Sequence, residues 1–149
     1  MKVVIGLGNA LRGDDAAGPA TVEQLRPRLN GTVQLFTLND PLQLPDCLEG
    51  AELAVVCDAV CSGAAPGTLH RFEAHAAPLP ASVRPALSSH GIGLAEVVEL
   101  ARRLGRLPRR LVIFGIEGHC FEPGTPLSPE VAAAVPRAAE AILQELCDA

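Results

Sequence analysis

The sequence contains no tryptophan and no tyrosine, and only four of its 149 residues are phenylalanine. Proteins that bind nucleic acids usually combine a positive surface with aromatic side chains on which bases stack. This chain has a formal net charge of −5 and little aromatic surface. We therefore expect no nucleic-acid partner.

One basic cluster stands against the acidic balance. Its first members end a predicted helix, where cations complement the helix dipole. A solvated helix end is therefore the favoured interpretation, and docking of an acidic partner protein is the alternative. The cluster consists of Arg102, Arg103, Arg106, Arg109 and Arg110.

Long apolar runs and paired cysteines are also missing. No apolar run approaches the roughly 20 residues that span a bilayer. The six-residue run 3–8 that follows Lys2 and ends in Gly8 is too short for a secretory signal. The five cysteines are irregularly spaced and form no Cys-x-x-Cys pair, which disfavours a zinc ribbon or a disulfide framework. We expect no membrane segment, a cytoplasmic location and reduced thiols.

Apolar residues make up 48% of the chain and charged residues 19%, which is typical of a globular protein. The length predicts a single domain over residues 1–149. Apolar or alternating runs predict strands at residues 2–7, 32–38, 53–60, 68–72 and 110–116. Helical signals predict helices beginning near Pro19, at Ser88 or Ser89, and at Ser128, and a short helix between Asn39 and Gly50, whereas residues 74–85 are expected to form a loop.

Strands and helices thus alternate along the chain. Alternation of this kind predicts a three-layer α/β/α fold with a mostly parallel, twisted sheet of about five strands, similar to phosphorylase- and hydrolase-like folds. Sites in such folds lie outside the carboxyl ends of the strands.

The stretch from Gly6 to Gly18 follows the first predicted strand and holds several glycines and two adjacent acids. Such a turn could cradle a phosphate or start a helix. The Gly6-x-Gly8 pair begins a dinucleotide-binding pattern, but Leu11 stands where the third glycine belongs. A nucleotide-binding module is therefore only a rival interpretation.

Polar residues occur at three places near the expected site edge. Asp14 and Asp15 follow the first strand, Asp58 lies in the apolar run of the third, and His90 precedes a helix. Carboxylates with an imidazole suit an open site for a divalent metal such as nickel or zinc.

Each of these residues also has a structural alternative. Asp14 or Asp15 could cap the first helix, Asp58 could accept from loop amides near Ser62, and His90 could be a structural residue. A carboxylate inside an apolar run is costly without partners, which favours a functional role for Asp58. The other histidines, at positions 70, 75 and 119, are expected to be structural or exposed.

Five ordered blocks of the sequence resemble the hydrogenase maturation proteases, the endopeptidases that finish nickel–iron hydrogenase large subunits. The first block is Gly6-x-Gly8-Asn9-x-Leu11-x-x-Asp14-Asp15-x-x-Gly18. The others are Val56-Cys57-Asp58-Ala59-Val60, Ala65-Pro66-Gly67-Thr68, Ser89-His90-Gly91-Ile92-Gly93-Leu94, and Phe114-Gly115-Ile116-Glu117 with Leu127-Ser128-Pro129-Glu130-Val131. Two segments depart from patterns seen in some members, at 38–44 and 117–120.

The resemblance implies removal of a C-terminal extension from the large-subunit precursor after nickel insertion. It implies that Asp15, Asp58 and His90 sense nickel that the precursor brings, with Asp14 as second choice for the first acid. These three residues are the expected catalytic and metal-binding set, and zinc or cadmium could bind them in the isolated protein. Nickel could polarise the scissile bond, or it could be a recognition tag while an aspartate acts as base.

Other functions remain open at this point. A non-catalytic nickel checkpoint or chaperone for the same precursor would use the same three ligands. A peptidyl-tRNA hydrolase also opens with an apolar strand and Gly-Leu-Gly-Asn, but the residues after Asn9 do not resemble that family. We expect a monomer that binds the precursor transiently.

Overall fold

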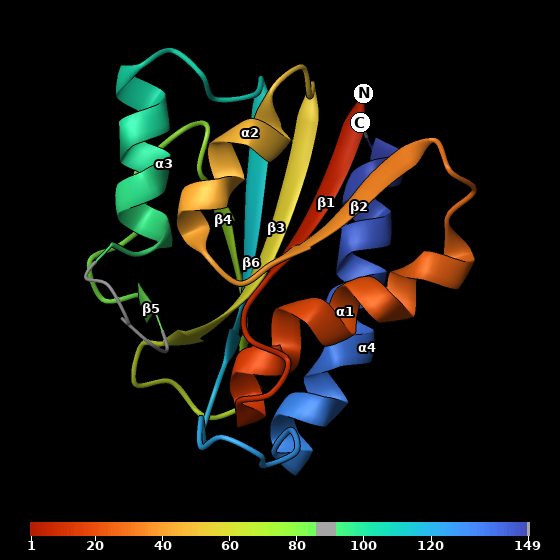
Figure 1. Cartoon of the computed structure of the whole chain (residues 1–149), viewed down its shortest axis with the longest axis vertical. Helices are drawn as coiled ribbons and strands as arrows, with labels where there is room; N and C mark the ends of the chain where they lie inside the picture. Colours follow the sequence, from red (N-terminus) through yellow and green to blue (C-terminus); the bar gives the residue numbers. More distant parts are fainter. Residues whose placement is uncertain (86–91, 149) are drawn as a thin grey trace.

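The computed structural model describes residues 1–85 and 92–148. A sheet with strand order β2-β1-β3-β6-β4 forms its centre, and a short strand β5 pairs with β3 (Figure 1). Strands β2, β1, β3 and β6 are parallel, while β4 and β5 run antiparallel to β6 and β3. The strands are β1 (Lys2–Leu7), β2 (Val33–Leu38), β3 (Leu53–Cys61), β4 (Leu69–Glu73), β5 (Arg84–Pro85) and β6 (Arg110–Glu117).

Helices cover both faces of the sheet, which gives the predicted three layers (Figure 1). Helices α1 (Ala17–Leu25) and α4 (Pro129–Asp148) pack on one face, and α2 (Leu44–Leu48) and α3 (Leu94–Arg103) pack on the other. The described residues also include the short 3₁₀ helices η1 (Gly13–Ala16), η2 (Arg26–Arg28) and η3 (Pro41–Gln43). Within residues 1–85 and 92–148, no helix combines the length and apolarity needed to cross a bilayer.

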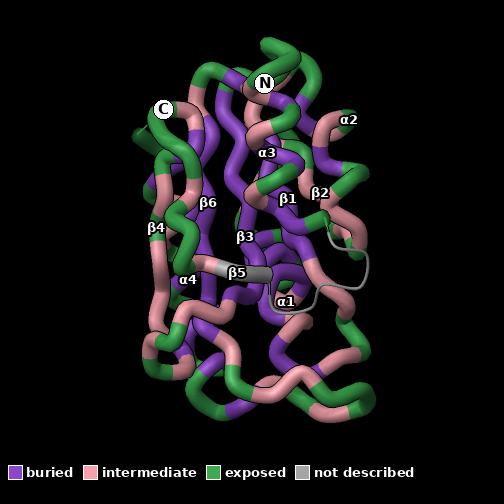
Figure 2. Tube along the Cα trace, turned by 90° about the vertical axis from the view of Figure 1, so that its left-hand side faces the viewer, coloured by how far each residue is buried: buried purple, intermediate pink, exposed green. Residues whose placement is uncertain are grey.

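The central strands are buried on both faces, as their continuous apolar runs predicted (Figure 2). Along β3, Val55 and Cys57 contact the α1/α4 layer, while Ala54 and Val56 contact the α2/α3 layer. The two-residue repeat of a strand therefore directs Asp58 toward the α2/α3 face. The edge strand β4 is only partly buried.

Two expectations about local structure were wrong. The segment 74–85 is not all loop, because Arg84 and Pro85 pair with β3 as β5. Neither Ser88 nor Ser89 caps α3, since this helix begins at Leu94. Its cap position is Gly93, whose N–H donates to the Glu96 carboxylate at 3.0 Å. The two serines themselves lie outside the described residues.

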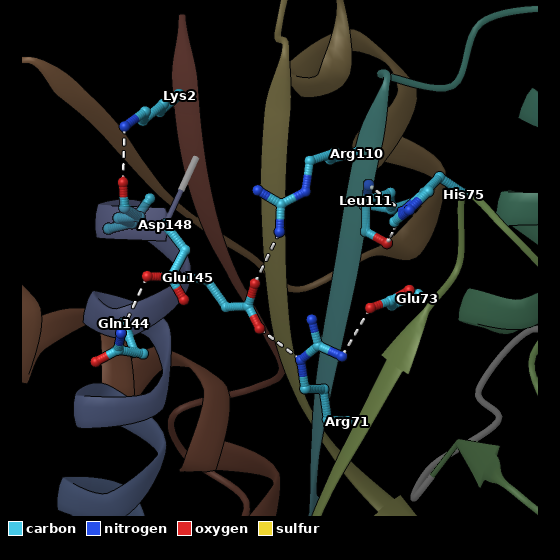
Figure 3. A network of polar contacts seen from close by, with 10 residues as sticks. Lys2, Arg71, Glu73, His75, Arg110, Leu111, Gln144, Glu145 and Asp148 are labelled. Atoms are coloured by element: carbon cyan, nitrogen blue, oxygen red, sulfur yellow. Dashed lines mark hydrogen bonds and ion pairs between the residues drawn. The ribbon is translucent and has the colours of Figure 1, made fainter.

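An ion-pair network fastens the end of α4 to the amino edge of the sheet (Figure 3). The Glu145 carboxylate, on α4, accepts hydrogen bonds from Arg71 of β4 and from Arg110 of β6. Lys2 of β1 donates to the Leu146 carbonyl at 2.7 Å. These contacts stand at the opposite end of the parallel strands from Asp58.

Most arginines of the predicted basic cluster form ion pairs within the chain. Arg102 pairs with Glu99 and donates to the Ala74 carbonyl, and Arg106 pairs with Glu49. Together with Arg110 in the Glu145 network, three of the five arginines have partners within the chain. This supports the solvated-helix interpretation over a docking surface for an acidic protein.

At the carboxyl edge, Asp14 fastens η1 to the connection between β6 and α4. Its side chain is fully buried and accepts from the N–H groups of His119, Cys120 and Ser128 and from the Ser128 hydroxyl, at 2.7–2.9 Å. Burial alone would raise the pKa of Asp14, but these hydrogen bonds outweigh it and lower the pKa from its usual 3.8. Asp14 is therefore an ionised structural group.

Helix α1 approaches β1 and β3 through glycine. A Cβ on Gly18 would lie 2.3 Å from the Leu7 carbonyl oxygen and 2.5 Å from that of Cys57. A Cβ on Gly6 would lie 2.5 Å from the Gly18 carbonyl oxygen. Glycine at both positions thus allows backbone contact between the first turn of α1 and the two central strands.

Replacing Asp14 with asparagine should destabilise the protein. Asp14→Asn removes the negative charge that accepts four hydrogen bonds, and it places an amide NH₂ group opposite some of the donors. We therefore expect the free energy of unfolding, measured with urea at pH 7, to fall by about 2–4 kcal/mol. The loss should shrink as the pH falls below 3.8, because the unfolded chain then takes up a proton that the folded Asp14, with its lowered pKa, still resists. Asp148→Asn, at an exposed position, is the control; equal stability of the two variants would contradict this role.

Gly18→Ala should also destabilise the fold, although alanine is the better helix former by about 1 kcal/mol. The added methyl group would overlap backbone atoms, which cannot move aside as a side chain can. We expect a net loss of about 2 kcal/mol or more in the free energy of unfolding. The matched control is Gly31→Ala: Gly31 has φ +86° but no neighbour within 4 Å of the added carbon, so only backbone strain of about 1 kcal/mol applies. A Gly18 variant no weaker than the Gly31 variant would refute the packing argument.

Candidate functional site

Asp58 is a carboxylate buried in the sheet. It lies on β3 opposite Gly115 of β6, and only 9% of its surface is exposed. Burial raises the pKa of Asp58 to about 8, and the nearby charge of Asp15 adds to the rise, while the Ala59 N–H partly offsets it. Asp58 therefore holds a proton at neutral pH.

Asp15 reaches the same place from η1. Its Oδ2 accepts a hydrogen bond from the Asn9 N–H at 2.7 Å. Burial raises the pKa of Asp15, while the Asn9 N–H and the positive charge of Arg12 oppose the rise. The charge of Asp15 acts on Asp58, and we call the two aspartates at the carboxyl edge of β1 and β3 the acid pair.

The glycines of the opening motif allow the close packing that places these two acids. Gly8 has φ +138°, and a Cβ there would lie 1.9 Å from the Asp15 carbonyl oxygen. The contact between Gly18 and Cys57 sets the first turn of α1 directly beside the residue that precedes Asp58. The motif is therefore a close-packing device that brings η1 to β3, which argues against the phosphate-cradle interpretation.

Neither acid of the motif caps a helix, so that alternative is wrong for both. The cap positions of η1 and α1 are Arg12 and Ala16, and neither has a side-chain cap. Asp14 points away from the pair into the loop after β6, whereas Asp15 faces Asp58. Geometry thus favours Asp15 over Asp14 as the first functional acid.

The third predicted site residue, His90, lies outside the described residues. Among the residues described, no group of three His, Cys, Asp or Glu side chains is arranged to hold a metal ion. The acid pair alone offers carboxylate oxygens, which suit a borderline or hard divalent metal and need a further ligand to bind it well. A three-residue set of Asp15, Asp58 and His90 remains a prediction.

A further buried acid, Glu117, was given no role by the sequence reasoning. It ends β6 with 3% of its surface exposed. Its carboxylate accepts from the Ser62 N–H at 2.8 Å and the Ser62 hydroxyl at 2.6 Å, and the His70 Nε2 lies 3.1 Å away. Accepting hydrogen bonds from the loop near Ser62 was the structural role considered for Asp58. Glu117 has that role instead. The signal available in the sequence was an acid closing an apolar strand run.

The pKa of Asp58 predicts a pH-dependent stability. The folded protein keeps the Asp58 proton up to about pH 8, whereas the unfolded chain releases it near 3.8. Stabilisation is thus complete below pH 3.8 and is lost as the pH rises toward 8. Relative to Asp58→Asn, metal-free wild type should lose up to about 1.4 kcal/mol of unfolding free energy per pH unit between pH 5 and 7. Urea titrations of both proteins measure this, and a constant difference across that range would contradict the buried proton.

Comparison with known proteins bears on this site. The family model described as hydrogenase maturation protease matches residues 38–145. The Hydrogenase 2 maturation protease of Escherichia coli K12 is 30% identical, over 97% of this chain and 89% of that protein. The hydrogenase expression/formation protein HupD of Thiocapsa roseopersicina is 32% identical over 97% of this chain, which spans only 66% of that relative's length.

Solved structures agree. The hydrogenase maturating endopeptidase HybD from E. coli has a TM-score of 0.83 at 29% identity, covering 99% of this chain and 92% of that one. The solution structure of an endopeptidase from E. coli has a TM-score of 0.85 at 28% identity, covering 99% and 93%. The predicted fold class is therefore confirmed, and the chain belongs to the hydrogenase maturation protease family.

Proposed function

We propose that this chain is an endopeptidase that removes the C-terminal extension of a nickel–iron hydrogenase large-subunit precursor after nickel insertion. Membership of the hydrogenase maturation protease family supports the hydrolase activity and the class of substrate. The observation that carries the proposal is the acid pair, in which Asp58 is buried and protonated beside Asp15 at the carboxyl edge of the sheet. A structural protein would gain little from keeping a buried carboxyl beside a second acid there.

Two neighbouring carboxyls, one ionised and one protonated, suit peptide hydrolysis. The ionised member takes a proton from water, and the protonated member supplies one to the leaving nitrogen. In this chain Asp15, the more exposed and Arg12-assisted acid, is the base, and Asp58 is the proton donor. This division of roles is the aspartic-type version of the proposal.

Nickel enters with the substrate. In the proposal, Asp15, Asp58 and His90 test the nickel that the precursor already carries, so that only a loaded subunit is cut. In this nickel-binding version of the proposal Asp58 gives up its proton as the metal binds, and two carboxylates and one imidazole then leave coordination positions free for the precursor's own ligands. Binding of that nickel would also fix the scissile bond relative to the acid pair. The protease is proposed to act as a free cytoplasmic monomer that meets its precursor transiently.

The proposal is tested by mixing the purified chain with nickel-loaded or nickel-free precursor and following the mass of the precursor. Wild type should shorten only the loaded precursor. Asp15→Asn and Asp58→Asn should lower the cleavage rate by about 10²- to 10⁴-fold, because each removes one acid–base partner. Asp46→Asn, which changes an exposed carboxylate on α2 in the same way, should cleave like wild type.

Three results would count against this function. Equal cleavage of both precursors would remove nickel as the recognition element. Binding of the loaded precursor without any loss of mass would favour the non-catalytic checkpoint. Full activity of Asp58→Asn would show that the acid pair does not catalyse the cleavage.

A further inference from the structure

Arg12 shares one tight turn with Asp15. The Arg12 N–H donates to the Asn9 carbonyl at 3.2 Å, and the Asp15 N–H donates to the Arg12 carbonyl at 3.0 Å. The preceding residue, Leu11, is 76% exposed. The turn therefore holds Arg12, which is itself partly buried, next to an exposed residue and three positions before Asp15.

The Arg12 side chain has an unsatisfied donor. Its Nε is buried and has no hydrogen-bond partner, which holds for no other buried side-chain nitrogen or oxygen in the described part of the chain. A buried N–H that has lost water without gaining an acceptor is unfavourable, and native proteins rarely keep one. Such a group calls for an acceptor that the free protein does not supply.

The neighbouring acids do not supply that acceptor. Over residues 1–85 and 92–148, no carboxylate lies within ion-pair distance of Arg12. Asp14 is fully engaged with the loop after β6, and Asp15 accepts from Asn9. Arg12 and Asp15 are neighbours in the turn, and the positive charge of Arg12 partly offsets the rise that burial causes in the pKa of Asp15, although the two form no ion pair.

We propose that the Arg12 guanidinium binds the main-chain carbonyl oxygen of the scissile peptide bond in the precursor. The inference rests on the proposed endopeptidase function. A neutral carbonyl fits better than a substrate carboxylate, because the Asp15 charge would repel a second anion beside this turn. The planar fork of donors on arginine is well suited to an oxygen acceptor, and the orphaned Nε–H belongs to that fork.

Arg12 then stabilises the charge that develops during hydrolysis. A water oxygen forms a bond to the carbonyl carbon as its proton passes to the acid pair, and the C=O π electrons move onto the oxygen held by Arg12. When the C–N bond breaks, those electrons re-form the carbonyl and the nitrogen takes a proton from the acid pair. One water is consumed and two chain ends are released, with Arg12 unchanged. Preorganised donors of this kind act mainly on the transition state.

The test compares Arg12→Met and Arg12→Lys with the control Arg109→Met, using the full chain and nickel-loaded precursor. Methionine keeps an unbranched apolar side chain but removes every donor, lysine keeps the charge without the fork, and Arg109 is exposed on β6's preceding loop. Single-turnover cleavage is measured over a range of protease concentrations, and the melting temperature of each free protein is recorded.

For Arg12→Met we expect the saturating cleavage rate to fall about 100-fold, with the half-saturating concentration within about twofold of wild type. Arg12→Lys should fall between the two, and Arg109→Met should match wild type. The melting temperature of Arg12→Met should equal or exceed that of wild type, because an unsatisfied buried donor has been removed.

Several outcomes would overturn the inference. A wild-type rate in Arg12→Met excludes a role in the reaction, and a change confined to half-saturation places Arg12 away from the scissile carbonyl. A lower melting temperature assigns Arg12 a structural role instead. If wild type itself leaves the loaded precursor uncut, the proposed function fails as well, whereas cleavage by wild type together with an indifferent Arg12 variant refutes this inference alone.

Discussion

The arrangement of this molecule depends on the direct backbone contact between the first turn of α1 and the ends of β1 and β3. Gly18 stands with no room for a side chain between the carbonyl oxygens of Leu7 and Cys57. Because Cys57 is followed by Asp58, and η1 leads directly into α1, this contact also fixes how near Asp15 comes to Asp58. Close packing of main chain is thus the condition under which two carboxyls from distant parts of the sequence become one site.

Adjacent acids in the motif have opposite jobs because their surroundings differ. Asp14 has four donors from the loop after β6 and is ionised, so it contributes stability. Asp15 has one backbone donor and faces a buried carboxyl, so its charge is less well compensated. Peptide geometry turns successive side chains of η1 in different directions, which lets one acid hold the turn while its neighbour serves the site.

The sequence allowed prediction of what depends on local pattern. The continuous apolar run of β3, the proline in the first turn of α1 and the glycine-rich motif led to the fold class and to Asp15 and Asp58. It did not allow prediction of contacts that depend on register between distant strands. The hydrogen bonds between Ser62 and Glu117 join residues 55 positions apart. Strand β5 forms where Arg84 and Pro85 pair with the end of β3. The family resemblance already favoured Asp15 over Asp14, but the structural role of Asp14 depends on partners at residues 119–128 that the sequence did not reveal.

Favourable and unfavourable polar groups are unevenly distributed over the sheet. At the amino edge, Glu145 is satisfied by two arginines, and beside the site Asp14 and Glu117 are satisfied by several donors each. The Asp58 carboxyl and the Nε of Arg12 are less well satisfied, and their residues lie toward the carboxyl end of β3 and in the turn after β1. Buried polar groups without full hydrogen bonding occur mainly where function requires them, and the rest of the structure must be stable enough to offset their unfavourable free energy. Asp14 and Glu117 anchor loops on the two connections that flank the pair, so they are the groups that allow an unfavourable acid and an unsatisfied guanidinium to persist in a folded chain.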